Sequence, residues 1–139
     1  MTREEKLRAF VDGYTIEVPA AKVENELSYI MTQLRHGMQY EALSGGEFHL
    51  DPRGELEAQR PQLERLAYLE VKQELVLKDV AARQNFTVTR AELEAEAAAM
   101  AERQGCSVEL IRSFFGEDLA MLERDVKRKK AEDWICEQI

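Results

Sequence analysis

Apolar residues recur at steps of three and four along two long stretches of this chain, and that spacing constrains its fold more than any other feature. Between Ala20 and about Leu43 the series is Val23, Leu27, Ile30 or Met31, Leu34, Met38 and Ala42. Such a series is typical of an amphipathic α-helix. A second stretch carries enough apolar residues to cover more than one stripe of a helix, so we expect a buried spine. Its members are Leu63, Leu66, Leu69, Val71, Leu75, Val76, Leu77 and Val80.

Local signals predict where the first helices begin and end. Thr2 and Glu5 have the spacing of a capping box, which predicts a short helix over about 2–12 that ends at Gly13. The residues 14–18 alternate apolar and polar side chains before Pro19 and are expected to be extended.

The middle of the chain carries the strongest helix breaks. Ser44-Gly45-Gly46 ends the long amphipathic helix, and residues 47–51 are expected to form a tip. Pro52 restarts the helical pattern. Pro61 lies inside it and predicts either a kink or a new helix that begins at about residue 61.

The stretch "RQNFTVTRAELEAE", Arg83 to Glu96, changes from strand-like to helix-like within a few residues. We expect an extended corner near 86–88, followed by Thr89 as the cap of a helix over about 90–104, with Glu92 as its capping-box partner. Gly105 ends that helix, Ser107 opens a short one that Gly116 breaks, and a final helix is predicted from about Glu117 to Cys136.

The predicted fold is all-α, a single elongated multi-helix domain over 1–139 with two helical-hairpin arms. Arm one covers about 20–60, a spine covers about 61–85, and arm two covers about 90–137. The length of 139 residues suits one domain.

Charge and composition narrow the function. The formal net charge is −8, which disfavours general binding to nucleic acid or to anionic membranes. No apolar run is long enough to span a bilayer, and "MTREEKLRAF" has no apolar core of a signal peptide, so a soluble cytoplasmic protein is expected. Cys106 and Cys136 are expected to be reduced thiols.

An ordered series of motifs resembles the C-terminal domain of bacterial trigger factor, the ribosome-associated chaperone. The resemblance covers about 14–139. In chain order the matching residues are Val18-Pro19, Val23-Glu24-Asn25-Glu26, Val71-Lys72, Leu75-Val76-Leu77, Val80-Ala81, Phe86-Thr87-Val88-Thr89 and Glu92-Leu93.

The resemblance implies a helical body with two projecting arms that form a cradle for unfolded or nascent polypeptides. The ribosome-docking and prolyl isomerase domains of that family do not fit in 139 residues. Ribosome docking and proline isomerisation are therefore not expected from this chain alone, whether it is an excised domain or a naturally short homologue.

A chaperone that holds unfolded chains needs adaptable apolar surface, for which methionine and aromatic side chains are suited. The ordinary alternative for such residues at helical spacing is a place in the core, and we favour the core for Met31 and Met121. For each of Phe114 and Phe115, core and surface are equally expected. Trp134 is expected to fix the last helix to the body. The candidate peptide-binding residues are Met31, Met38, Tyr40, Leu43, Phe48, Phe114, Phe115 and Met121.

Other clusters favour structural interpretations. The basic run 127–130 is expected to form a solvated helix face with four i,i+4 ion pairs. These pairs are Glu123–Lys127, Asp125–Lys129, Arg128–Glu132 and Lys129–Asp133. His36 and His49 have no Cys or carboxylate at metal-ligand spacing, so no metal or other cofactor is expected.

Three function classes remain, and the third, a small enzyme without a recognisable motif, is disfavoured because no catalytic motif appears. The first is an ATP-independent holdase that binds unfolded or nascent polypeptides. The alternative is a helical scaffold or adaptor that binds one specific partner or associates with itself, for instance as a homodimer.

Overall fold

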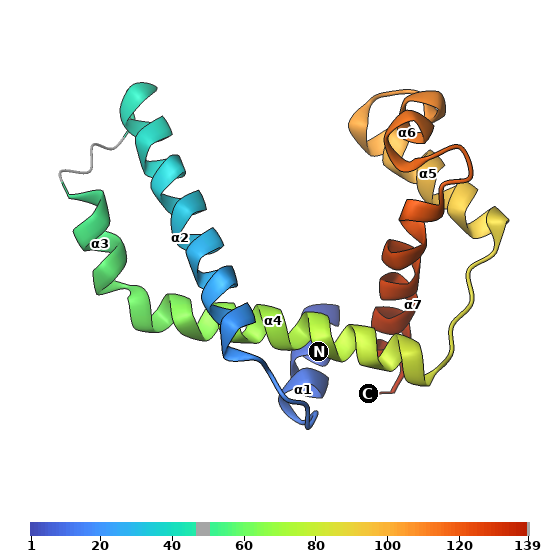
Figure 1. The fold of residues 1–139 in the computed structure, drawn as a ribbon, viewed down its shortest axis with the longest axis horizontal. Helices are drawn as coiled ribbons and strands as arrows, with labels where there is room; N and C mark the ends of the chain where they lie inside the picture. Colours follow the sequence, from blue (N-terminus) through green and yellow to red (C-terminus); the bar gives the residue numbers. More distant parts are fainter. Residues whose placement is uncertain (47–50, 139) are drawn as a thin grey trace. The chain divides into compact units, whose positions relative to one another are not determined.

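The computed structural model describes residues 1–46 and 51–138, which form α-helices and one 3₁₀ turn, with no strand among them. The predicted all-α class is confirmed. Figure 1 shows the helices in chain order. Their bounds are α1 Arg3–Asp12, α2 Ala20–Leu43, α3 Pro52–Ala58, α4 Arg60–Arg83, α5 Arg90–Gln104, α6 Val108–Phe115, the 3₁₀ turn η1 Ala120–Leu122 and α7 Glu123–Glu137.

The chain divides into two compact units. Unit 1 comprises Met1–Gly13 and Val76–Ile139, and unit 2 comprises Tyr14–Leu75. The helix α4 contributes its first part to unit 2 and its last part to unit 1. None of the described helices is both long and apolar enough to cross a bilayer.

Both predicted capping boxes form. The Thr2 hydroxyl accepts a hydrogen bond from the Glu5 amide at 3.1 Å, and the Glu5 carboxylate accepts from the Thr2 amide at 3.1 Å. The Thr89 hydroxyl likewise accepts from the Glu92 amide, and the Glu92 carboxylate accepts from the Thr89 amide. These bonds satisfy backbone amides that a helix start leaves without partners, so α1 and α5 begin where the sequence predicts.

Pro61 begins a new helix rather than kinking an older one. The carbonyl of Gln59 accepts hydrogen bonds from the amides of Gln62 and Leu63, at 3.0 Å each, so α4 starts at Arg60. Pro61 therefore occupies the first turn, where a missing N–H costs no intrahelical bond.

The corner between α4 and α5 is neither helix nor strand over residues 86–89. Asn85 ends α4 in the left-handed region at φ 52°, and the Phe86 amide donates back to the Ala81 carbonyl at 3.3 Å. The Lys130 ammonium donates to the Thr87 carbonyl at 2.5 Å. The β-like residues of this corner thus serve as a connection that α7 holds in place.

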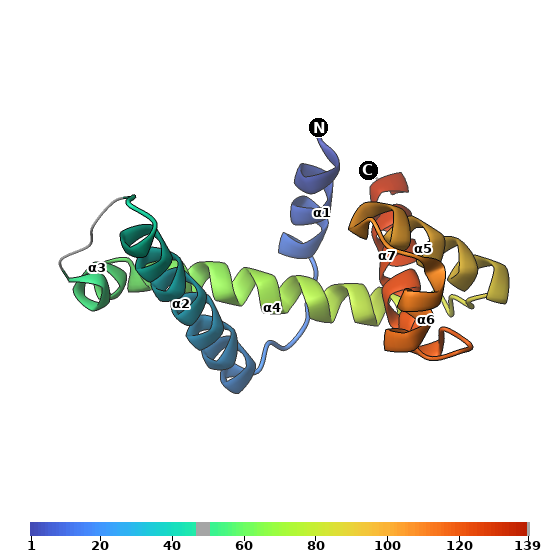
Figure 2. The same cartoon turned by 90° about the horizontal axis from the view of Figure 1, so that it is seen from above.

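Unit 1 has a core built from small and branched side chains, and α5 packs against both α6 and α7 within it (Figures 1 and 2). The alanines of α5 allow its neighbours to approach closely. The buried cluster, called the unit 1 cluster below, consists of Ala97, Ala101, Ile111, Leu119 and Leu122.

The helix α1 packs against α7 in the same unit. Phe10 and Trp134 meet edge to face with ring centroids 6.0 Å apart. Arg3 donates to the Asp133 carboxylate at 2.6 Å. Trp134 therefore fixes the last helix against α1, as the sequence predicts.

The predicted start of the final helix at Glu117 is wrong, because α7 begins at Glu123. Leu119 adopts the left-handed region at φ 58° with its side chain fully buried in the unit 1 cluster. The Asp118 carboxylate accepts from the Ala120 amide at 3.1 Å. Burial of Leu119 thus favours a turn over the helix that the local sequence allows.

Unit 2 has a smaller core. Its buried cluster, called the unit 2 cluster, is Leu27 of α2 with Leu63 and Ala67 of α4. The half-buried side chains of Val23, Ile30 and Met31 pack around it. The helix α3 packs against α2, and the Asp51 carboxylate caps it by accepting from the Gly54 amide at 3.1 Å.

The spine prediction holds for most of its residues and is wrong for Leu66. Ala67 is fully buried in the unit 2 cluster, whereas Leu66 is 41% exposed. Consecutive helical residues differ by about 100° in direction, so the residue beside a buried alanine turns away from the contact. The buried members are Leu63, Val71, Val76, Leu77 and Val80.

Candidate functional site

The end of α2 presents large apolar side chains on the surface of unit 2. Tyr40 is 73% exposed and Leu43 is 89% exposed. They are three residues apart, so they lie on one face of the last turn of the helix. Met38 is half-buried on the same helix. Ser44 and Gly45 follow directly, with Gly45 at φ 84°.

A second exposed apolar group lies on unit 1. Phe114 of α6 is 71% exposed and Met121 of η1 is 67% exposed. The expected burial of Met121 is wrong, because its neighbour Leu122 takes the core position instead. Leu110, which the sequence analysis missed, is 46% exposed and lies one turn before Phe114. The sequence signal for Leu110 was its spacing, four residues before Phe114 on the same helix.

The adjacent phenylalanines separate. Phe115 is half-buried and packs against the unit 1 cluster, while Phe114 points away from it. Consecutive helical positions face different directions, which accounts for the split.

Among the predicted residues Phe48 lies outside the described residues, as does His49.

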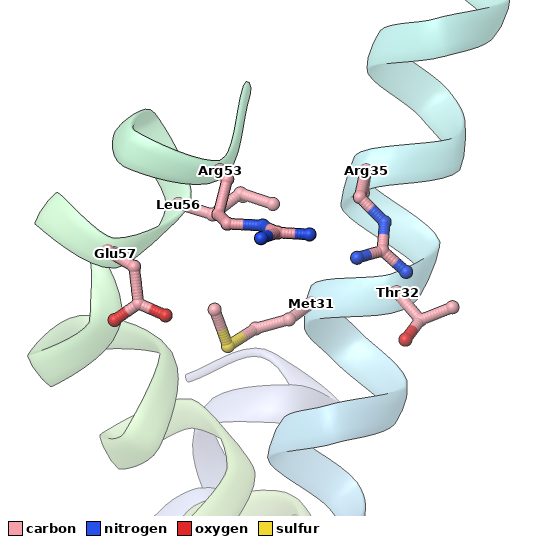
Figure 3. A pocket seen from close by; sticks show the side chains of 6 residues that line it. All are labelled: Met31, Thr32, Arg35, Arg53, Leu56 and Glu57. Carbon is pink, nitrogen blue, oxygen red and sulfur yellow. The ribbon is translucent and has the colours of Figure 1, made fainter. Parts of the chain in front are cut away.

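Met31 is half-buried and has two contacts. It packs against the unit 2 cluster and also lines a pocket of about 240 Å³ between α2 and α3. The other lining residues are Thr32, Arg35, Arg53, Leu56 and Glu57. In Figure 3 the Arg53 side chain extends from α3 toward Arg35 on α2, and Met31 reaches back toward α3.

Of the charged side chains that line this pocket, the glutamate has an ion-pair partner among the described residues and the two arginines do not. Glu57 pairs with Arg60 at 3.4 Å. Within residues 1–46 and 51–138, neither Arg35 nor Arg53 forms a hydrogen bond or an ion pair. The two guanidinium groups are therefore available to an anion. Sequence alone does not pair these arginines, because they are eighteen residues apart and meet only where α3 packs against α2.

The basic run of α7 makes two of the four predicted ion pairs and other contacts that were not predicted. The pairs Glu123–Lys127, at 3.1 Å, and Arg128–Glu132, at 3.5 Å, form as expected. Lys129, however, pairs with Glu96 of α5 at 2.9 Å, and Asp133 pairs with Arg3 of α1. Lys130 pairs with Glu92 at 2.6 Å. This run thus ties α7 to α5 instead of forming only a solvated face, and Asp133, outside the run, ties α7 to α1.

These contacts shift ionisation equilibria in unit 1. The hydrogen bond from Lys130 lowers the pKa of Glu92, and the backbone amide of Thr89 acts in the same direction. Burial by itself would raise the pKa of Glu96, but the hydrogen bonds and charges of Lys129 and Arg103 outweigh it and lower that pKa. The Glu94 carboxylate, which accepts from Arg112, raises the pKa of that guanidinium. Each shift arises from pairing that stabilises the helix packing.

The described part of the chain holds no group of three His, Cys, Asp or Glu side chains placed to bind a metal ion. Its exposed apolar side chains include two sets, called the α2 group (Tyr40 and Leu43) and the α6 group (Leu110, Phe114 and Met121). The arginine-lined pocket is a further surface feature. Such features are suited to contacts with apolar and anionic parts of another molecule.

Comparisons with known proteins assign the family. Residues 1–137 match the family model described as "Bacterial trigger factor protein (TF) C-terminus". The trigger factor of Listeria monocytogenes serotype 4a is 28% identical over 135 residues, which cover 97% of this chain and 31% of that protein. The trigger factor of Bacillus pumilus is 29% identical, with 97% of this chain and 32% of that protein covered. The trigger factor of Carboxydothermus hydrogenoformans is 28% identical over 127 residues, which cover 91% of this chain and 30% of that protein.

The chain spans about a third of the length of the curated relatives that it matches. No solved structure matches it significantly. Since the family model covers nearly all of its residues, the chain belongs to the family of bacterial trigger factor C-terminal domains.

Proposed function

We propose that this chain binds unfolded or nascent polypeptides as a holdase chaperone that needs no nucleotide. The observation that carries the proposal is the exposure of large apolar side chains in the α2 group and the α6 group, of which Leu43 is 89% and Phe114 is 71% exposed. Exposed leucine, tyrosine, phenylalanine and methionine side chains bury apolar area against varied partners without requiring one shape.

The surrounding charge favours the same proposal. The formal net charge of −8 disfavours association of the protein with itself through the exposed apolar groups. Both cysteines are free thiols, which suits a reducing cytoplasm. That the two arms enclose one cradle stays a prediction.

Suppression of aggregation tests the proposal. The protein, mixed at stoichiometric amounts with several unrelated denatured proteins and no nucleotide, is expected to reduce light scattering from each of them. A scaffold that binds one partner, or only itself, protects none of them, and that result would contradict the holdase.

Paired variants locate the surface. Replacing Leu43 and Phe114 by serine together is expected to reduce protection to about half or less, because these side chains supply much of the apolar contact area. The free energy of unfolding is expected to change by less than about 0.5 kcal/mol, since both side chains are exposed. The matched control replaces Tyr29 and Leu66, which are also exposed, by serine. Equal losses from both pairs would mean that protection does not depend on the α2 and α6 groups.

A further inference from the structure

The pocket between α2 and α3 combines two like charges with an apolar lining. Arg35 of α2 and Arg53 of α3 contribute guanidinium groups to the same cavity of about 240 Å³ (Figure 3). Among the described residues neither group has an anionic partner. Two cations that share a cavity repel each other, and an anion placed between them removes that cost.

The remaining lining restricts the kind of anion. The Met31 thioether and Leu56, which is 3% exposed, form an apolar part of the cavity. Glu57 pairs with Arg60 at 3.4 Å and, among the described residues, forms no ion pair with either pocket arginine. A ligand that fits must present a negative group and an apolar group close together.

We infer that this pocket binds the C-terminal α-carboxylate of a polypeptide whose last residue is apolar. The inference rests on the proposed function and specifies one contact of the bound chain. Guanidinium groups recognise carboxylates through charge-assisted, often bidentate hydrogen bonds. The side chain of the terminal residue contacts Met31 and Leu56.

The size of the cavity favours a chain end. Its volume of about 240 Å³ lies below the roughly 300–1,000 Å³ of sites that hold drug-sized ligands, so it accommodates about one residue. A terminal residue carries its carboxylate and its side chain on the same Cα atom, which places both groups in one small cavity. The net negative charge of the protein does not prevent this contact, because salt screens distant charges within about 10 Å.

Three short peptides with a neutral dye at the N-terminus test the inference by fluorescence anisotropy with the whole chain. The first is Gly-Ser-Gly-Ser-Leu with a free carboxylate, the second is its C-terminal amide, and the third is the amide of Gly-Ser-Gly-Asp-Leu. The free acid is expected to bind about tenfold tighter than either amide, because it alone places the carboxylate beside the leucine side chain on one Cα.

Charge-neutral variants connect the preference to the pocket. R35Q and R53Q are each expected to remove most of the preference for the free acid. The control R65Q neutralises an exposed arginine of α4 outside the pocket and is expected to keep it. The peptide comparison on the unchanged protein requires no variant to fold.

Each adverse outcome is specific. Equal binding of the free acid and its amide, or no binding of any peptide, would overturn the inference and leave suppression of aggregation untouched. Equal binding of the free acid and the aspartate-containing amide would assign the arginines to acidic side chains instead. A preference retained in both R35Q and R53Q would place the carboxylate outside this pocket.

Discussion

The helices within unit 1 and the helices within unit 2 are stabilised by different kinds of contact. In unit 1, charged side chains join helices that are distant in sequence, as in the pairs Arg3–Asp133, Lys129–Glu96 and Lys130–Glu92. In unit 2, Arg60 pairs with Glu57 and Glu64, which are three and four residues away. Its cations Arg35 and Arg53 line a pocket instead of joining helices.

The buried clusters of the two units also differ in size. The unit 1 cluster has five members, including the fully buried Leu119 and Leu122, whereas the unit 2 cluster consists of Leu27, Leu63 and Ala67. A packed core with ion pairs between helices specifies one arrangement, while a small core leaves side chains available for contacts with other molecules. We therefore expect unit 1 to contribute more to stability, and unit 2 to offer Arg35 and Arg53 for contacts with other molecules.

The largest expected effect concerns the unit 1 cluster. Leu122→Ala is expected to lower the free energy of unfolding by about 3–5 kcal/mol, because the side chain is fully buried and its removal leaves a cavity. Chemical denaturation measures the change. Leu110→Ala, at a 46% exposed position in the same unit, is the control and is expected to cost less than about 1 kcal/mol. Similar costs for both would mean that the cluster does not determine the stability of unit 1.

Two glycines, one in each unit, are expected to respond with opposite signs. Gly105 ends α5 at φ 66°, so Gly105→Ala is expected to destabilise by about 1 kcal/mol. Gly37 lies inside α2 with no atom within 4 Å of an added Cβ, so Gly37→Ala is expected to stabilise by up to about 1 kcal/mol. Thermal unfolding of both variants gives the comparison. Destabilisation by Gly37→Ala would show that α2 needs flexibility there.

The smallest effect depends on pH. Glu96→Gln is expected to cost about 0.2–1 kcal/mol at pH 7, because the charged carboxylate pairs with Lys129 and Arg103. Pairing with Lys129 and Arg103 in the folded state lowers the pKa of Glu96 below its ordinary value of 4.5, so this stabilisation is present above pH 4.5 and disappears as the pH falls through the folded pKa.

Unfolding curves at several pH values between 7 and 3 measure this dependence. The difference between the wild type and Glu96→Gln is expected to shrink on acidification. Glu102→Gln, an exposed change on the same helix, serves as the control and is expected to show a smaller difference at pH 7. A difference for Glu96→Gln that stays constant with pH would show that the carboxylate charge does not stabilise unit 1.

Much of the helix layout was predictable from sequence, since local hydrogen bonds set most helix starts. The capping boxes at Thr2 and Thr89 and the first-turn proline Pro61 depend on residues only a few positions away. The exception is α7, whose start depends on the burial of Leu119 among residues of α5 and α6. No local pattern contains that information.

The candidate surfaces were predictable only in part. Tyr40 and Leu43 are exposed, and residue type and position near a turn made them candidates from the sequence. Phe114 is exposed as well, but the sequence left core and surface equally open for it. Phe115 and Met121 show the limit, because the first packs on the core and the second lies outside it. Which of two neighbouring apolar residues is buried depends on the helix that packs against them.

The sequence by itself determined the all-α class and most of the helix starts, because periodicity and capping act over one or two helical turns. The family of this chain follows from its ordered motifs and from the family model that matches residues 1–137. Tertiary structure alone decided that Lys129 and Lys130 connect α7 to α5 and that Arg35 and Arg53 share a pocket. These partners are separated by many residues in the chain. Their contacts exist only after apolar burial has brought their helices together.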